Sequence, residues 1–121
     1  MEILDMKCAK CGHLIANAVC NDETLITKSL GVLQEDGVYA FFLWCASKAG
    51  GIKKEAFAFL QEDGILKHLF GEELDQMKAI REKFDDNLDE LLFAKELLER
   101  TLVYARYHAK ASGNSSGSGG A

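Results

Sequence analysis

The sequence predicts an all-α protein, a single compact bundle of about four to six helices formed by residues 1–111. Three observations support this fold class. The 121 residues include no proline, which interrupts helices. Leu, Ala, Glu and Lys, which favour helices, are abundant. Residues 85–111 also repeat apolar side chains at steps of three and four, the spacing of one helix face. This length is enough for one domain and too short for two.

The first three helices are placed by their apolar runs and by the residues that interrupt them. We expect helices over about 3–20, 24–49 and 53–70. Asp22 or Thr24 is suited to cap the second helix, and Gly50-Gly51 is suited to end it. The second helix contains the most apolar run, VYAFFLWCA at 38–46. Because this run is too continuous for a surface helix, we expect it to be the central element of the bundle.

A short repeat marks two junctions along these helices. The pattern Leu-Gln-Glu-Asp-Gly occurs at 33–37 and again at 60–64. A glycine after an aspartate inside an apolar helix indicates a kink, or a helix end followed by a new start. Two similar helix junctions explain the pattern more simply than a repeat protein, because repeat arrays need about three units to bury a shared core.

The fourth helix is expected from Glu72 through Phe84, and a break near Asp86-Asn87 precedes the final one. The final helix has an acidic beginning and a basic end, which complement the helix dipole. The face expected to be buried consists of Leu88, Leu91, Leu92, Leu98, Leu102 and Ala105. A second stripe, Arg100, Tyr104 and His108 with Tyr107 beside it, alternates basic and aromatic side chains. It suits a solvated face, a partner interface or a surface for a polyanion.

The last residues, 112–121 (SGNSSGSGGA), contain no large apolar side chain. Their composition is that of a flexible linker, so we expect a disordered tail outside the fold.

Charge and hydropathy exclude some classes of protein. No apolar run approaches the ~18 residues that cross a bilayer, and the opening MEILDMKC lacks a signal-peptide core, so we expect a cytoplasmic protein with no membrane contact. The net charge of −5 disfavours an independent nucleic-acid binder. The charge is uneven, however: residues 100–110 contain no acid, and partner choice depends on such patches.

The cysteines allow a metal site as an alternative. Cys8 and Cys11 form a Cys-x-x-Cys followed by glycine, as in half of a zinc knuckle, and His13 and Cys20 would complete four ligands. The second half of the usual pattern is absent, and the intervening residues are helical in character. We therefore expect buried reduced thiols, with Cys45 in the core, and no cofactor.

No pattern indicates catalysis. His13, His68 and His108 show no ligand spacing, and His68 and His108 are expected at the surface or at helix ends. No glycine-rich phosphate loop follows a strand, and no nucleophile is framed by a recognisable turn. We expect the protein not to be an enzyme.

Basic residues at helix ends are candidates for contacts with phosphates. They are Lys48, Lys53, Lys54, Arg100, Arg106 and Lys110. Each is a solvated charge by default, but together they suit the RNA backbone, the commonest contact of nucleic-acid-binding proteins.

Three segments resemble the small all-helical subunit of type III-B (Cmr-type) CRISPR effector complexes. LDMKCA at 4–9 is similar to the family's first helix, Leu-Asp-Gln-x-Arg-Ala. VLQEDGVYAFFLWCASK at 32–48 resembles its middle helix, where an apolar–Gln–x–x–Gly turn leads to Ala-Phe-Leu and then Ser-Lys. ELLERTLVYARYHA at 96–109 is similar to its final helix, which has a basic–aromatic–Ala ending.

The resemblance implies a non-catalytic subunit of an antiviral ribonucleoprotein. Copies would stack along the guide RNA–target RNA duplex, beside the other subunits, and contact its backbone. Lys48 matches the family's Ser-Lys lysine, and Arg106 falls in its basic–aromatic ending. The chain departs from the family in its acidity, its cysteine-rich start and the lack of a tryptophan near the final helix. The alternative function is a zinc-stabilised or purely protein-binding helical module, and self-association is compatible with either.

Overall fold

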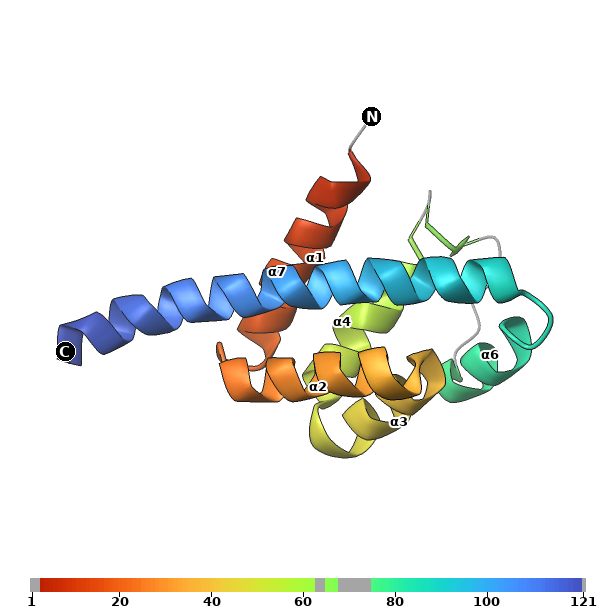
Figure 1. The fold of residues 1–121 in the computed structure, drawn as a ribbon, viewed down its shortest axis with the longest axis horizontal. Coiled ribbons are helices and arrows are strands. Elements are labelled where there is room, and N and C mark those ends of the chain that lie inside the picture. The colour runs from red at the N-terminus through yellow and green to blue at the C-terminus, as the bar shows by residue number, and fades with distance from the viewer. Residues whose placement is uncertain (1–2, 63–64, 68–74, 121) are drawn as a thin grey trace.

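The computed structural model describes residues 3–62, 65–67 and 75–120, with side chains as far as Ser112. The predicted all-α bundle is confirmed: the described ranges contain six helices and no strand. The helices are α1 (Leu4–Ala18), α2 (Glu23–Asp36), α3 (Val38–Lys48), α4 (Gly50–Leu60), α6 (Gln76–Lys83) and α7 (Leu88–Gly120). Figure 1 shows α7 running the length of the molecule, with α1 crossing it steeply and α2 lying along it.

The junction between α1 and α2 follows the sequence closely. Cys20 and Asn21 have positive φ angles of 53° and 60°, which end α1 in a tight turn. Of the two predicted caps for α2, Asp22 is the one used, because its Oδ1 accepts a hydrogen bond from the Leu25 amide at 3.0 Å. Asp75 caps α6 in the same way through the Lys78 amide.

The predicted helix over 24–49 is two helices, and Gly37 separates them. Gly37 has φ 95° and ψ −176°, a conformation that side-chain-bearing residues rarely adopt. The first copy of the repeated pattern therefore does end one helix and start another. Gly64, the glycine of the second copy, lies outside the described residues.

The prediction that Gly50-Gly51 ends this region was wrong by a residue or two. The break falls at Ala49, with φ −152° and ψ 65°, and the two glycines begin α4. At Gly51 the backbone of α4 lies close to the end of α1: a Cβ there would lie 3.1 Å from Ala18 Cβ and Ala18 O, tighter than most side chains accept.

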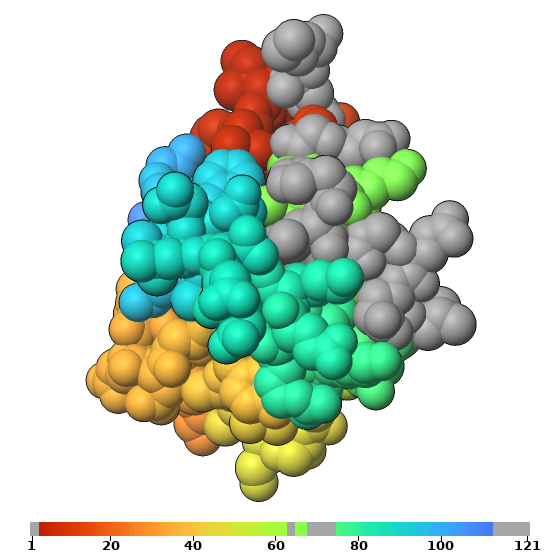
Figure 2. All heavy atoms as spheres, turned by 90° about the vertical axis from the view of Figure 1, so that its right-hand side faces the viewer, coloured from red at the N-terminus to blue at the C-terminus, as the bar shows by residue number. Residues whose placement is uncertain are grey.

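The run at 38–46 is not the central element that its continuity predicts. Phe41, Phe42 and Cys45 are buried, but Tyr39 and Leu43 are exposed on the opposite face of α3. Helix α3 lies at one edge of the bundle (Figure 1), where it packs on α2, α4 and α6 and, less closely, on α7. Figure 2 shows the end of the molecule where α6 and the beginning of α7 lie between α1 above and α2 and α3 below. The pair in closest association is instead α1 and α7.

The last helix begins at Leu88, after the predicted break, so Asp85 and Asp86 lie in the preceding turn. Its buried face differs from the predicted one. Leu98, Leu102 and Ala105 are buried as expected, whereas Leu88 and Leu92 are exposed. The remaining buried residues of α7 are Ala94, Leu97, Thr101 and Ala109. Compared with the prediction, the buried face of α7 is turned toward the small residues Thr101 and Ala105. These residues are buried because α1 crosses α7 closely at this point.

Residues 112–120 continue the backbone of α7. Among the residues of α7 whose side chains are described, the last buried one is Ala109, and Lys110, Ala111 and Ser112 are exposed. The packed part of the helix therefore ends close to the predicted boundary at 111. The flexibility expected of 112–121 stays a prediction.

Candidate functional site

The crossing of α1 and α7 is fixed by a glycine. A Cβ at Gly12 would lie 2.8 Å from Ala105 N, Thr101 O and Tyr104 Cβ, closer than real Cβ contacts come. The two helix backbones therefore touch at this point. The glycine after Cys8 and Cys11, which resembles part of a zinc knuckle in the sequence, is explained by this helix packing.

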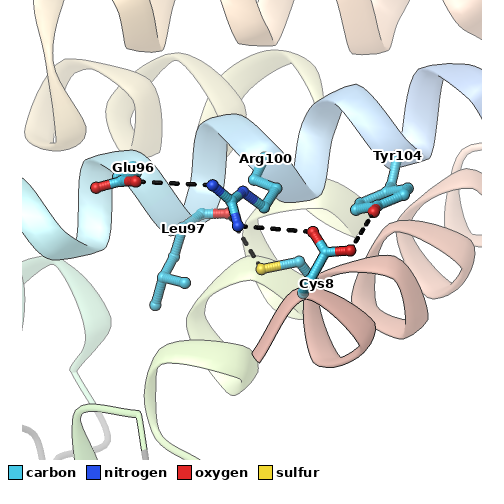
Figure 3. Close-up of polar contacts among 6 residues, drawn as sticks. Cys8, Glu96, Leu97, Arg100 and Tyr104 are labelled. Carbon is cyan, nitrogen blue, oxygen red and sulfur yellow. Dashed lines mark hydrogen bonds and ion pairs between the residues drawn. The ribbon is translucent and has the colours of Figure 1, made fainter. Parts of the chain in front are cut away.

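Polar side chains tie the two helices together on either side of Gly12. The Tyr104 hydroxyl donates to Asp5 Oδ2 at 2.6 Å, and Arg100 Nη1 lies 3.6 Å from Asp5 Oδ1. Arg100 Nη2 also lies 3.7 Å from Glu96 Oε1 (Figure 3). The hydrogen bond to Asp5 raises the pKa of Tyr104, because the carboxylate stabilises the protonated hydroxyl.

The imidazoles of His13 and His108 meet at the other end of the crossing. Their ring centroids are 5.1 Å apart in an edge-to-face arrangement, and Asn17 Nδ2 lies 3.3 Å from His13 Nε2. Three members of the basic–aromatic stripe, Arg100, Tyr104 and His108, thus face α1. The sequence suggested a solvated face, a partner interface or a surface for a polyanion; these three residues instead form an internal contact between helices α1 and α7. Tyr107 points away and is exposed.

The four residues of the alternative zinc site do not converge. The Cys8 thiol donates to the Leu97 carbonyl of α7 at 3.9 Å, and the Cys11 thiol donates to the Glu55 carbonyl of α4 at 3.7 Å. His13 lies on another side of α1 against His108, and Cys20 is exposed in the following turn. No group of three or more metal-binding side chains occurs in the described ranges.

Burial governs the chemistry of the cysteines. All four are free thiols, and Cys8, Cys11 and Cys45 are buried as expected, whereas Cys20 is exposed. Burial raises the pKa of Cys11 and of Cys45 to about 12. It also raises the pKa of Cys8, partly offset by the Thr101 hydroxyl and Arg100. These buried thiols stay protonated at neutral pH and are poor nucleophiles.

A shallow cavity of about 310 Å³ lies between α1 and α4, over Cys11. Lys7 and Lys10 from α1 and Glu55 and Glu62 from the other side line it, so its walls carry both signs of charge. Cys11 at its floor is a core thiol with a raised pKa.

The predicted phosphate-binding residues fall into two groups. Lys48 and Lys54 are exposed and Lys53 is half-buried, and all three flank the break between α3 and α4. Arg106 is half-buried and Lys110 exposed near the end of the packed part of α7. Arg100 belongs to neither group, because it lies between the carboxylates of Asp5 and Glu96. His68 lies outside the described residues.

The beginning of α4 has a feature that the sequence analysis missed. Ala49 provides no side-chain cap, and the first turn of α4 contains no acidic residue. In the described part of the chain, no hydrogen bond occupies the amides of Gly50 and Gly51. A Cβ at Gly50 would meet no atom within 4 Å, so this side is open. The signal in the sequence is two glycines flanked by three lysines without an acid between them.

Comparisons with protein-family models, with curated proteins and with solved structures found no match. Among the described residues, none of the helices has the length and apolar character needed to span a membrane.

Proposed function

We propose that this chain is a non-catalytic small subunit of an RNA-guided effector complex of the type III-B kind. In this proposal it packs along the guide RNA–target RNA duplex beside the other subunits, and it contacts the RNA backbone from the junction of α3 and α4. The single observation that carries the proposal is the uncapped, open beginning of α4 with Lys48, Lys53 and Lys54 around it.

The physical argument starts from the dipole of α4. The first amides of a helix carry partial positive charge, and an acidic cap or first-turn carboxylate usually neutralises it. Helix α4 has neither, and the charged residues nearest to its beginning in the sequence are Lys48, Lys53 and Lys54. Free amides together with ammonium groups attract a phosphate. Gly50 leaves space for the phosphate to approach the backbone.

The resemblance supports the same proposal through the way its segments pack. The similar stretches lie in α1 (4–9), across α2 and α3 (32–48) and in α7 (96–109). These helices pack on one another: α1 on α7, α2 on α7, and α2 on α3. The resemblance therefore covers parts of four helices of the bundle, and α4 and α6, which also supply core residues, lie outside it. Lys48, which matches the family's lysine, stands at the α3–α4 junction.

The test measures binding to a guide–target RNA duplex by fluorescence anisotropy at several salt concentrations. The triple variant Lys48→Glu, Lys53→Glu, Lys54→Glu should bind at least tenfold more weakly. The slope of its plot of log affinity against log salt concentration should be smaller in magnitude by roughly two to three, because each lost phosphate contact removes about one released counterion.

The matched control reverses three other lysines, Lys28→Glu, Lys78→Glu and Lys83→Glu, which lie on α2 and α6. Both variants change the net charge equally, so only the position differs. Equal losses in the two variants would make the binding a response to net charge and would overturn the assignment to α4. Binding of the first variant at the parent's affinity would overturn it as well. A pull-down from the source cell then asks whether the parent protein travels with guide RNA and large subunits.

The zinc-stabilised alternative is disfavoured, because Cys8, Cys11 and His13 contact different helices and Cys20 lies in the turn after α1. The protein-binding alternative has an observation in its favour, the exposed apolar side chains of Leu88, Leu92 and Tyr107 on α7.

A further inference from the structure

Helix α7 has four apolar residues outside its fully buried face. Leu88, Leu92, Val103 and Tyr107 lie within an arc of about 100° at 100° per residue, the outer face of α7. The same arc contains charged residues, which are Asp89, Glu96, Glu99, Arg106 and Lys110. Leu88, Leu92 and Tyr107 are 64%, 54% and 61% exposed, and Val103 is half-buried and packs partly against the core. The other sides of α7 contact α1 through Arg100, Tyr104 and His108, and α2 through Lys95.

Charge is divided along the same helix. From Leu88 to Glu99 there are four acids and one base, Lys95, and Asp85 and Asp86 add two acids in the turn just before the helix. From Arg100 to Lys110 there are three bases and no acid. One half of α7 is therefore complementary to the other half of a second α7. A parallel pair would place acid against acid, whereas an antiparallel pair places acid against base.

The apolar residues of the outer face are placed symmetrically about the middle of α7, so they too would match in an antiparallel pair. Leu88 and Tyr107 lie equally far from the midpoint between Leu97 and Leu98, and so do Leu92 and Val103. In an antiparallel pair centred on that midpoint, each leucine meets an apolar residue of the other copy. The same midpoint relates Asp89 to Arg106. A two-fold contact needs such a self-complementary surface, in which residue i meets j and j meets i.

We propose that the outer face of α7 is a docking surface for a second copy of this chain, which pairs with it antiparallel. This goes beyond the proposed function and is measured without RNA, so either idea can fail while the other stands. The contact is weak, because Glu96 and Glu99 of one copy come near Glu99 and Glu96 of the other. Weak, closed pairing of this kind depends on protein concentration and on salt.

The exposed face of α3 supplies a matched control. Leu43 is 49% exposed, close to the 54% of Leu92, and both are leucines on helix surfaces. The α3 face has no charge division of this kind, and its Tyr39 hydroxyl accepts a hydrogen bond from Arg81 at 3.4 Å. The same substitution at Leu92 and at Leu43 therefore compares the proposed docking surface with an exposed surface that has no proposed role.

The experiment is sedimentation velocity over a hundredfold range of protein concentration. The parent should approach twice the mass of one 13.3 kDa chain at high concentration, and added salt should weaken the association. Leu92→Glu should raise the dissociation constant at least tenfold, whereas Leu43→Glu should leave it within twofold. A parent that stays monomeric throughout would overturn the proposal, as would equal effects of the two substitutions.

Charge reversal tests the antiparallel arrangement. The variants Arg106→Glu, Lys110→Glu and Asp85→Lys, Asp89→Lys should each self-associate more weakly than the parent, because each has a more uniform α7. Mixed together, the two variants should associate again. A mixture that stays monomeric would overturn the charge pairing. Association of the parent that strengthens with salt would mean that repulsion between like charges outweighs the pairing of the acidic and basic halves, and would overturn the proposed charge complementarity.

Discussion

The Tyr104 hydroxyl donates a hydrogen bond of 2.6 Å to Asp5 Oδ2, which joins the first and last helices across 99 residues of sequence. Asp5 also faces Arg100, so its carboxylate receives a hydroxyl and a guanidinium from one stripe of α7. The stripe that alternates basic and aromatic residues is therefore used inside the molecule. Its role is to hold α1 at one angle across α7.

Tyr104→Phe should lower the melting temperature by removing this hydrogen bond. The pKa of Tyr104 is raised above the value near 10 of the unfolded chain, so the stabilisation is present below pH 10 and is lost as the pH rises through the folded-state pKa. Thermal melts of the parent and Tyr104→Phe at pH 7 and pH 11 test this. The difference between the two proteins should shrink at pH 11. In Asp5→Asn, the same tyrosine substitution should have a smaller effect at pH 7. An undiminished effect would exclude coupling between the two residues.

Gly12→Ala should destabilise the protein by about 3 kcal/mol, the upper range for forcing an extra carbon into a packed site. The added Cβ would lie 2.8 Å from backbone atoms of α7, which cannot move away as a flexible side chain can. Urea unfolding followed by circular dichroism measures the change.

Gly31→Ala is the control for this substitution. Gly31 also lies inside a helix, but a Cβ there would meet no atom within 4 Å. Alanine should therefore stabilise α2 by about 0.5–1 kcal/mol through its helix propensity. Opposite signs at the two glycines are expected. A Gly12→Ala protein as stable as the parent would mean that the helices do not touch at this point.

The sequence predicted local structure well where a few neighbouring residues decide it. Short-range geometry decides three such features: the cap of α2 at Asp22, the break between α2 and α3 at Gly37, and the start of α7 after Asn87. The all-helical class followed from composition. The buried state of Cys8, Cys11 and Cys45 followed from their place within helices.

The positions of the faces were harder to predict, because they depend on which helix lies opposite. Periodicity marks Leu88 and Leu92 as buried, but α1 crosses α7 nearer to Thr101 and Ala105, so the core lies on the side with small residues. In the same way, the apolar run at 38–46 looks central, yet α3 lies at an edge. The apolar residues of α3 and α7 that face away from the neighbouring helices stay exposed at the surface.

The site was predicted only in part. Lys48, Lys53 and Lys54 were chosen for their charge, and the structure adds the uncapped beginning of α4 between them. Nothing in a single sequence pairs Asp5 with Tyr104 or His13 with His108, because these contacts depend on how two helices cross. The function of the basic residues remains a prediction that the RNA measurements test.

The buried thiols should make the protein unstable in alkali. The pKa of Cys11 and of Cys45 is about 12 in the folded chain and near 9 when unfolded. A raised folded-state pKa gives stability that is complete below pH 9 and is lost as the pH rises toward 12, because the unfolded chain releases these protons first. Each thiol contributes up to about 4 kcal/mol of this loss. Urea unfolding under reducing conditions, from pH 8 to pH 11, measures the slope.

Cys11→Ala together with Cys45→Ala should flatten that slope, whatever its effect on stability at pH 8. Cys20→Ala is the control, because Cys20 is exposed and its substitution should leave the slope unchanged. A double variant that loses stability with pH as steeply as the parent would assign the alkaline transition to other groups, such as Tyr104.

Thr101→Val tests a buried hydroxyl beside Cys8. Thr101 is fully buried, and its Oγ1 makes no hydrogen bond within the described part of the chain. Valine has nearly the same shape without the polar atom, so the substitution should stabilise the protein by about 1 kcal/mol. Thr27→Val on the exposed side of α2 is the control, and surface substitutions of this kind change stability by within about 0.5 kcal/mol. The Thr101 hydroxyl can donate to Cys8 when that thiol is deprotonated, which lowers the pKa of Cys8, so that pKa should rise further in Thr101→Val. Stability that falls in Thr101→Val, together with a raised Cys8 pKa, would mean that the hydroxyl and the thiol form a net stabilising hydrogen bond at the centre of the α1–α7 contact.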